Sequence, residues 1–277
     1  MTIRDIVAVL DVIEESMPAA QVALQLATRF KAHLTGLALA VEPIIPPLLV
    51  SPIPVDIIAE AQIQADARAK AAVGRFESYA KAAGIAAATR QEAVIAGAMT
   101  EVIAEVCRLT DLVVIGQDDP GRPDPGRAQA IEAVLFGAAR PLLGVPPGFS
   151  PAAQFPRIVV GWDGSQPAAR ALVAARPFLR LAAHVEVVAV DHPVDETGDI
   201  CTEPVTYLAR HDIAAQSVHI ASDGDGIGMA LSRHVEATGS NLLVMGGFGK
   251  SRFREFVLGG ATRQMLRAMP VPVLMAH

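Results

Sequence analysis

A glycine-containing loop near the C-terminus carries the clearest chemistry in this sequence. Gly246 and Gly249 follow a short apolar run, residues 241–245, and Gly259 and Gly260 stand at the head of another segment. Glycine lets backbone N–H groups approach a bound group closely and adopts positive φ without steric cost. A strand that ends in such a loop and leads into a helix N-terminus can bind an anion, and phosphate is the natural ligand. The alternative is that these glycines only form a turn between a strand and a helix.

Cationic and hydroxyl side chains of the same loop could contact that phosphate. Lys250, Ser251 and Arg252 directly follow the first glycine pair, in a protein whose net charge is −6. Their positive charges would neutralise phosphate oxygens. An ordinary solvated surface is the other interpretation. Thr262 could donate to phosphate or cap the helix that follows, and the sequence does not distinguish these two roles.

The spacing of the glycines resembles the signature of the universal stress protein family. That signature is a glycine, two residues, a glycine, nine residues, and a glycine followed by Ser or Thr. Gly246, Gly249 and Gly259 match it, whereas Gly260 stands at the hydroxyl position. Other nucleotide loops fit less well: a Walker A motif would need a glycine in place of Val244, and no G-x-G-x-x-G follows a first strand.

A second group of candidate residues lies at predicted strand ends upstream of the loop. Asp163 ends a strand and precedes Ser165, a good N-cap, and Pro167, which suits a first helical turn. The resemblance implies that Asp163 contacts the adenine side of a nucleotide and that the backbone at Val190 meets the base. Asp163 could instead only hold the turn. His192, after the second strand, is interpreted as a loop residue.

The chain repeats one plan twice, so we expect two domains, residues 1–148 and 155–277. Residues 6–11 (IVAVLD) match 158–163 (IVVGWD), and residues 111–116 (DLVVIG) match 241–246 (NLLVMG). Strands alternate with helical segments in each half, which indicates βαβ units and parallel sheets. The predicted fold is therefore α/β, with two tandem doubly wound domains that each contain a mainly parallel five-stranded sheet.

The predicted elements are strands and one long helix. The helix is expected at 55–83, where apolar residues recur at helical spacing. Strands of the first half are expected at 3–10, 33–40, 86–93, 112–115 and 142–145. Strands of the second half are expected at 157–162, 184–190, 216–221, 241–245 and 271–275.

The first half lacks the phosphate-binding signature. Asp118 and Asp119 follow Gly116, and Phe136 stands where the second half has Gly259. We therefore expect no nucleotide there. In the family the last strand pairs across a dimer interface, so the resemblance implies that this tandem chain pairs its two last strands internally as a pseudo-dimer. A further homodimer stays open.

Composition excludes several classes of function. The negative net charge and the lack of a basic tract argue against nucleic-acid binding. The apolar segment 36–55 contains Glu42 and five prolines, which argues against a membrane span. The two cysteines, Cys107 and Cys201, form no CxxC pair, and the seven histidines show no HxxH spacing, so the sequence predicts no metal site. Asp223 to Gly226 is interpreted as a turn rather than a calcium loop.

The function expected from these features is a cytoplasmic stress-response regulator that binds ATP or AMP in its C-terminal domain. No general base or metal-binding carboxylate is evident near the loop, so at most weak ATP hydrolysis is expected. Two alternatives remain: a nucleotide-free interaction module, with the proline-rich segment from Pro43 to Pro54 as its docking element, and a slow ATPase.

Overall fold

The computed structural model describes residues 2–13, 16–42, 55–117, 125–149, 154–194, 198–248 and 260–277. The segment from Pro43 to Pro54 lies outside these ranges, as do Asp118 and Asp119. No helix in the described part of the chain is both long and apolar enough to cross a membrane.

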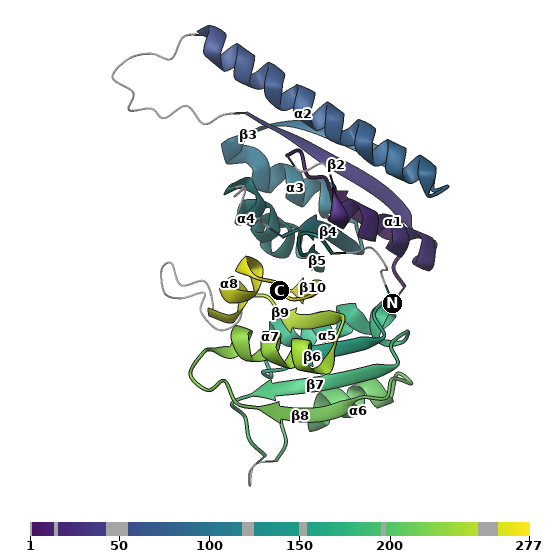
Figure 1. Ribbon diagram of the computed structural model, residues 1–277, viewed down its shortest axis with the longest axis vertical. Coiled ribbons are helices and arrows are strands. Elements are labelled where there is room, and N and C mark those ends of the chain that lie inside the picture. Colours follow the sequence, from purple (N-terminus) through teal and green to yellow (C-terminus); the bar gives the residue numbers. More distant parts are fainter. Residues whose placement is uncertain are drawn as a thin grey trace.

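Among the described residues each half contains five strands, and helices connect them (Figure 1). The strands of the first half are β1 Asp5–Val9, β2 His33–Glu42, β3 Ala88–Ile95, β4 Leu112–Gly116 and β5 Leu142–Val145. Its helices are α1 Pro18–Phe30, α2 Val55–Ala82, α3 Met99–Cys107 and α4 Pro125–Glu132, with a 3₁₀ turn Ala96–Ala98 and a π-helical segment Ala133–Ala138.

The second half repeats this order. Its strands are β6 Arg157–Gly161, β7 His184–Val190, β8 Gln216–Ile220, β9 Leu242–Gly246 and β10 Val273–Ala276. Its helices are α5 Gln166–Leu179, α6 Thr202–Ala209, α7 Ile227–Thr238 and α8 Gly260–Arg267. Every strand expected from the sequence is present, with ends shifted by a few residues at most, and the long helix ends one residue earlier than expected.

All ten strands belong to one sheet, in the order β3-β2-β1-β4-β5-β10-β9-β6-β7-β8. The neighbours within each half are parallel, whereas β5 and β10 pair antiparallel in the middle, with Leu274 opposite Leu143. The α/β fold and the internal pairing of the last strands are confirmed. The two expected five-stranded sheets are joined edge to edge, because each half ends in a strand that would otherwise expose unpaired backbone groups.

Helices cover both faces of this sheet, as the alternation of buried strand residues requires. On one face α1, α2, α5 and α6 pack against side chains such as Ile6 and Ile158. On the other face α3, the π-helical segment, α7 and α8 pack against side chains such as Val7 and Val159. Both cores contain buried residues from the two halves, so the halves share one sheet and two continuous core layers.

Candidate functional site

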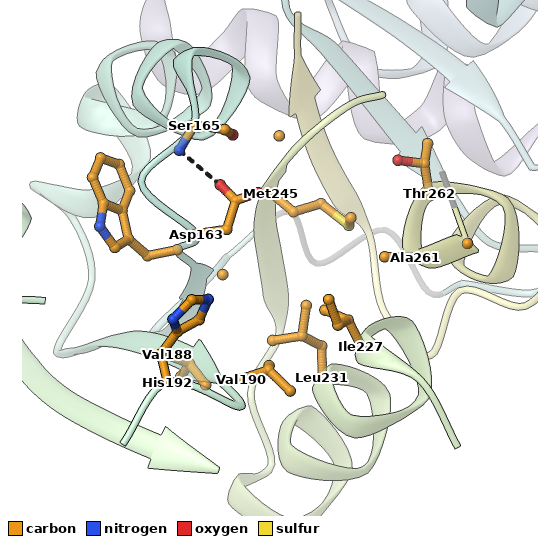
Figure 2. Close-up of a pocket in the computed structure, with 14 residues that line it drawn as sticks. Asp163, Ser165, Val188, Val190, His192, Ile227, Leu231, Met245, Ala261 and Thr262 are labelled. Carbon is orange, nitrogen blue, oxygen red and sulfur yellow. Dashed lines mark hydrogen bonds between the residues drawn. The ribbon is translucent and has the colours of Figure 1, made fainter. Parts of the chain in front are cut away.

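A cavity of about 360 Å³ opens at the carboxyl ends of β6, β7 and β9 (Figure 2). This is where open parallel sheets bind ligands, because the crossover helices leave a crevice there. The β6–α5 turn forms one side, the first turn of α8 the opposite side, and the end of β7 and the start of α7 lie between them. Its size is within the range of small-molecule sites.

The β6–α5 turn places an exposed carboxylate at the rim of the cavity. The backbone N–H of Ser165 donates to Asp163 Oδ1 (2.9 Å), and the N–H of Ala168 donates to Ser165 Oγ (3.2 Å). The expected N-cap role of Ser165 is therefore confirmed, as is the turn-holding role of Asp163. Asp163 Oδ2 has no hydrogen-bond partner among the described residues, so one carboxylate oxygen is available to a ligand.

Apolar side chains form the middle of the cavity. Val188 and Val190 come from β7, Met245 from β9, and Ile227 and Leu231 from the first turns of α7. All but Ile227 are buried. A flat apolar group such as an aromatic base could be buried against this surface.

Asp191 is not among the residues that line the cavity, although it directly follows Val190. Its φ is 56°, and its Oδ1 accepts a hydrogen bond from the N–H of Ser222 (2.8 Å). Hydrogen bonds from the hydroxyl and N–H of Ser222 lower the pKa of this exposed carboxyl. Asp191 therefore connects the end of β7 to the segment after β8, while Val190 lines the cavity.

Gly246 lines the cavity, and the packing of α5 against β9 requires a glycine at this position. A Cβ placed on Gly246 would lie 2.6 Å from the backbone N of Ala168 and 2.9 Å from the carbonyl carbon of Pro167. The first turn of α5 thus approaches β9 more closely than any side chain would permit. The helix N-terminus is brought directly to the edge of the cavity.

The start of α8 supplies the opposite wall, and one of its hydroxyls binds the backbone just after β9. Thr262 is buried, and its Oγ1 accepts a hydrogen bond from the N–H of Phe248 (3.0 Å). Gly260 is exposed, with open space around it. The other predicted loop residues lie outside the described ranges; they are Gly249, Lys250, Ser251, Arg252 and Gly259.

The equivalent crevice of the first half is nearly filled. It measures about 60 Å³, and the guanidinium of Arg127 enters it to bind the carboxylate of Asp11 at 2.5 Å. Both side chains are about nine-tenths buried. Arg127 Nη1 also donates to the carbonyl of Gln117 (3.3 Å) and lies 2.7 Å from the position that a Cβ on Gly116 would take. An internal ion pair thus occupies the position that the cavity has in the second half.

The comparisons with known proteins agree with this arrangement. Residues 154–277 match the model of the universal stress protein family. The C-terminal half of this chain is a universal stress protein domain. Comparison with curated protein sequences gives no match.

Solved structures extend the similarity in fold to nearly the whole chain. A universal stress protein from Archaeoglobus fulgidus DSM 4304 is 16% identical with a TM-score of 0.72, and the match covers 98% of this chain and 97% of that one. A protein of unknown function from Pseudomonas aeruginosa PAO1 is also 16% identical, with a TM-score of 0.61 and coverage of 98% and 92%. At such identities the similarity concerns the fold, and it covers both halves.

Sequence reasoning missed two groups of residues in this region. Ile227 and Leu231 line the cavity, and their spacing of four after a turn could have indicated a helix face directed at the crevice. Asp199, Cys201 and His219 converge beside the cavity. Their separation along the chain gave no recognisable ligand spacing, because a helix crossover brings them together.

Proposed function

We propose that this chain is a stress-response regulator that binds an adenine nucleotide, ATP or AMP, in its C-terminal domain. The observation that carries the proposal is the cavity between Asp163 and Thr262, which combines an apolar middle with polar ends. We further propose the domain limits 1–148 and 155–277, with a single nucleotide site in the second domain.

The polarity of the cavity suggests how the nucleotide is oriented. The base would lie against Val188 and Val190, with Asp163 at its polar edge. The phosphates would lie toward Gly246 and Gly260, because the backbone N–H groups at the start of α8 favour negative charge. Lys250, Ser251 and Arg252 would supply further phosphate contacts from the loop.

The equivalent crevice of the first domain is filled, and this difference supports a single nucleotide site. The Arg127 guanidinium already neutralises Asp11 and fills the equivalent crevice. Binding a nucleotide there would require breaking a nearly buried ion pair, which is costly because each partner would be left without its counter-charge. One nucleotide per chain follows.

Little hydrolysis is expected at this site. Asp163 and His192 are the titratable side chains among the described residues that line the cavity. Neither is accompanied by a second carboxylate that could hold Mg²⁺ with it, whereas phosphoryl transfer normally uses such groups. We therefore propose a nucleotide-binding role in preference to a slow ATPase.

Titration calorimetry of two matched variants tests the site. Asp163→Asn keeps an oxygen that can accept from Ser165 and removes only the charge. It should weaken ATP or AMP binding about tenfold, or by about 1.4 kcal/mol. Asp11→Asn, at the equivalent position of the first domain, should leave nucleotide affinity unchanged. Equal affinities of wild type and Asp163→Asn would contradict the placement of the site.

A further inference from the structure

Three metal-ligating side chains converge beside the cavity, in a region that the proposed function does not use. Asp199 and Cys201 immediately precede α6, and His219 lies on β8. A carboxylate oxygen, the thiol sulfur and a ring nitrogen of these residues all lie within 4.8 Å of one another. Among the described residues this is the one group of three or more such side chains that could hold a metal ion.

The hydrogen bonds around His219 show which ring nitrogen faces the cluster. His219 Nδ1 lies 2.6 Å from the backbone carbonyl oxygen of His192. A carbonyl oxygen can only accept, so Nδ1 carries a proton and donates. In the neutral imidazole, Nε2 then presents its lone pair, and this nitrogen points to Asp199 and Ser217.

This arrangement brings two electron-rich atoms together. His219 Nε2 lies 3.0 Å from Asp199 Oδ1, and an ionised carboxylate can only accept hydrogen bonds. A proton held between these two atoms, or a bound metal ion, would remove the repulsion between them.

A buried thiol completes the cluster. Cys201 is completely buried, although it belongs to a cluster whose other two side chains are about one-quarter exposed. A metal ion bound there would displace the proton of the thiol to solvent and bind the thiolate.

The polar neighbours of the cluster match the outer shell of a metal site. Ser217 Oγ donates to Asp199 Oδ2 (2.7 Å), and the N–H of Cys201 donates to Asp199 Oδ1 (2.7 Å). Together with the bond from His219 Nδ1 to a carbonyl, these contacts fix both the carboxylate and the imidazole. Metal-binding His and Asp side chains are oriented in this manner.

We propose that Asp199, Cys201 and His219 bind Zn²⁺ as three protein ligands, with a fourth position open to water. A thiolate, an imidazole and a carboxylate form a donor set typical of zinc, which prefers four ligands in a tetrahedron. The partial exposure of Asp199 and His219 lets water reach the fourth position.

The zinc site would also stabilise one wall of the cavity. The carbonyl that accepts from His219 belongs to His192, which lines the cavity. Trp162, another lining residue, donates from Nε1 to the carbonyl of Ile200 (3.1 Å), between the two ligands Asp199 and Cys201. The inference itself does not depend on nucleotide binding.

Metal titration of the complete, tag-free chain tests the proposal. Zn²⁺ is titrated in competition with a chromophoric chelator, and Co²⁺ serves as a spectroscopic substitute. We expect one ion per chain, with the thiolate-to-Co²⁺ charge-transfer absorption and the intense visible bands of tetrahedral cobalt. Affinity should fall as the pH is lowered, because protons compete for the thiol and the imidazole.

Two ligand variants and two matched controls locate the ion. Cys201→Ser should abolish the charge-transfer band, and His219→Gln should weaken Zn²⁺ binding more than about 100-fold, beyond what loss of an outer-shell contact costs. Cys107→Ser removes the other buried thiol, and His184→Gln removes an exposed histidine of β7. Both variants should bind Zn²⁺ as tightly as the wild type does.

Three results would overturn the proposal. They are an absence of binding, a cobalt spectrum without a thiolate band, and a spectrum unchanged in the ligand variants. If Cys201→Ser does not fold, as circular dichroism would reveal, His219→Gln decides the question because its side chain is partly exposed.

Discussion

At the scale of single residues, close packing and charge distinguish the two halves. Gly246 and Gly116 end equivalent strands, and each is approached too closely for a side chain. The neighbour is the α5 backbone in one case and the Arg127 guanidinium in the other. Gly246 therefore borders an open cavity, whereas Gly116 lies next to the arginine that fills the equivalent crevice of the first half.

Gly246→Ala should destabilise the fold. Its Cβ would lie 2.6 Å from the Ala168 backbone N, which cannot move without shifting α5. Overpacking of this kind costs about 1–3 kcal/mol. Urea unfolding measures the loss. The matched control is Gly74→Ala on the exposed face of α2, where a Cβ meets nothing and helix propensity should raise stability by about 0.5–1 kcal/mol.

If Gly246→Ala were as stable as the wild type, that result would contradict the close approach of α5 to β9. A control that also destabilised the chain would instead indicate that any change at a glycine is harmful.

Cys107 should make stability fall in alkaline solution. Burial raises the pKa of its thiol from 9.0 to about 12. Between these values the unfolded chain has lost the proton that the folded chain keeps, so the contribution is complete below pH 9 and is lost as the pH rises. The expected loss is roughly 1.4 kcal/mol per pH unit above 9.

Comparison with Cys107→Ser isolates this effect from other alkaline titrations. Urea unfolding at about pH 8 and about pH 10 should show a smaller decline for the variant. Equal declines in both proteins would mean that the Cys107 thiol is not held protonated by the fold.

At the scale of elements, the strands and the long helix could be predicted because their buried residues follow simple patterns. The strands are short apolar runs, since both faces of a parallel sheet are covered. In α2 the residues at helical spacing, such as Ala69, Ala72 and Phe76, are buried. The Phe76 ring even requires Gly36 on β2, because a Cβ there would lie 2.7 Å from it.

Contacts between distant elements could not be predicted in the same way. Nothing in the sequence pairs Arg127 with Asp11, or His219 with Cys201, since each pair is assembled by crossover helices. The position of Asp163 at a strand end could be foreseen because strand ends converge in this class of fold. The surroundings of Asp163 and Asp11 differ because Arg127, from another element, pairs with Asp11.

The tether between β9 and α8 should depend on one hydroxyl. Thr262→Val removes the acceptor for the Phe248 N–H and leaves that donor unsatisfied, at a cost of about 1–3 kcal/mol. Hydrogen exchange at the Phe248 amide should accelerate, while Thr262→Ser should retain the bond and the slow exchange. Unchanged exchange in Thr262→Val would show that the tether does not form in solution.

At the scale of the whole molecule, the two halves share one sheet and continuous cores. The antiparallel pair of β5 and β10 joins them. Aromatic side chains also cross the junction: Phe30 packs edge to face on Phe178 with ring centroids 5.4 Å apart, and Phe136 packs on Phe248 at 4.9 Å. The first half therefore supports the second structurally, in the way that a partner subunit would.

Unfolding should accordingly be a single cooperative transition. Buried side chains from both halves pack in the same two cores, so the loss of one half would expose the junction of the other. Differential scanning calorimetry should give one peak whose calorimetric and van't Hoff enthalpies agree. Two separate transitions would show that the halves are stable independently.

The central claim is that the second domain binds one adenine nucleotide and the first binds none. The most direct measurement is to denature the purified protein, identify any released nucleotide by chromatography, and titrate the emptied, refolded chain with ATP and AMP. The account predicts adenine nucleotide in the extract, or micromolar binding at one site per chain that weakens in Asp163→Asn and not in Asp11→Asn. An empty protein that binds neither nucleotide, or one that binds two per chain, would contradict it.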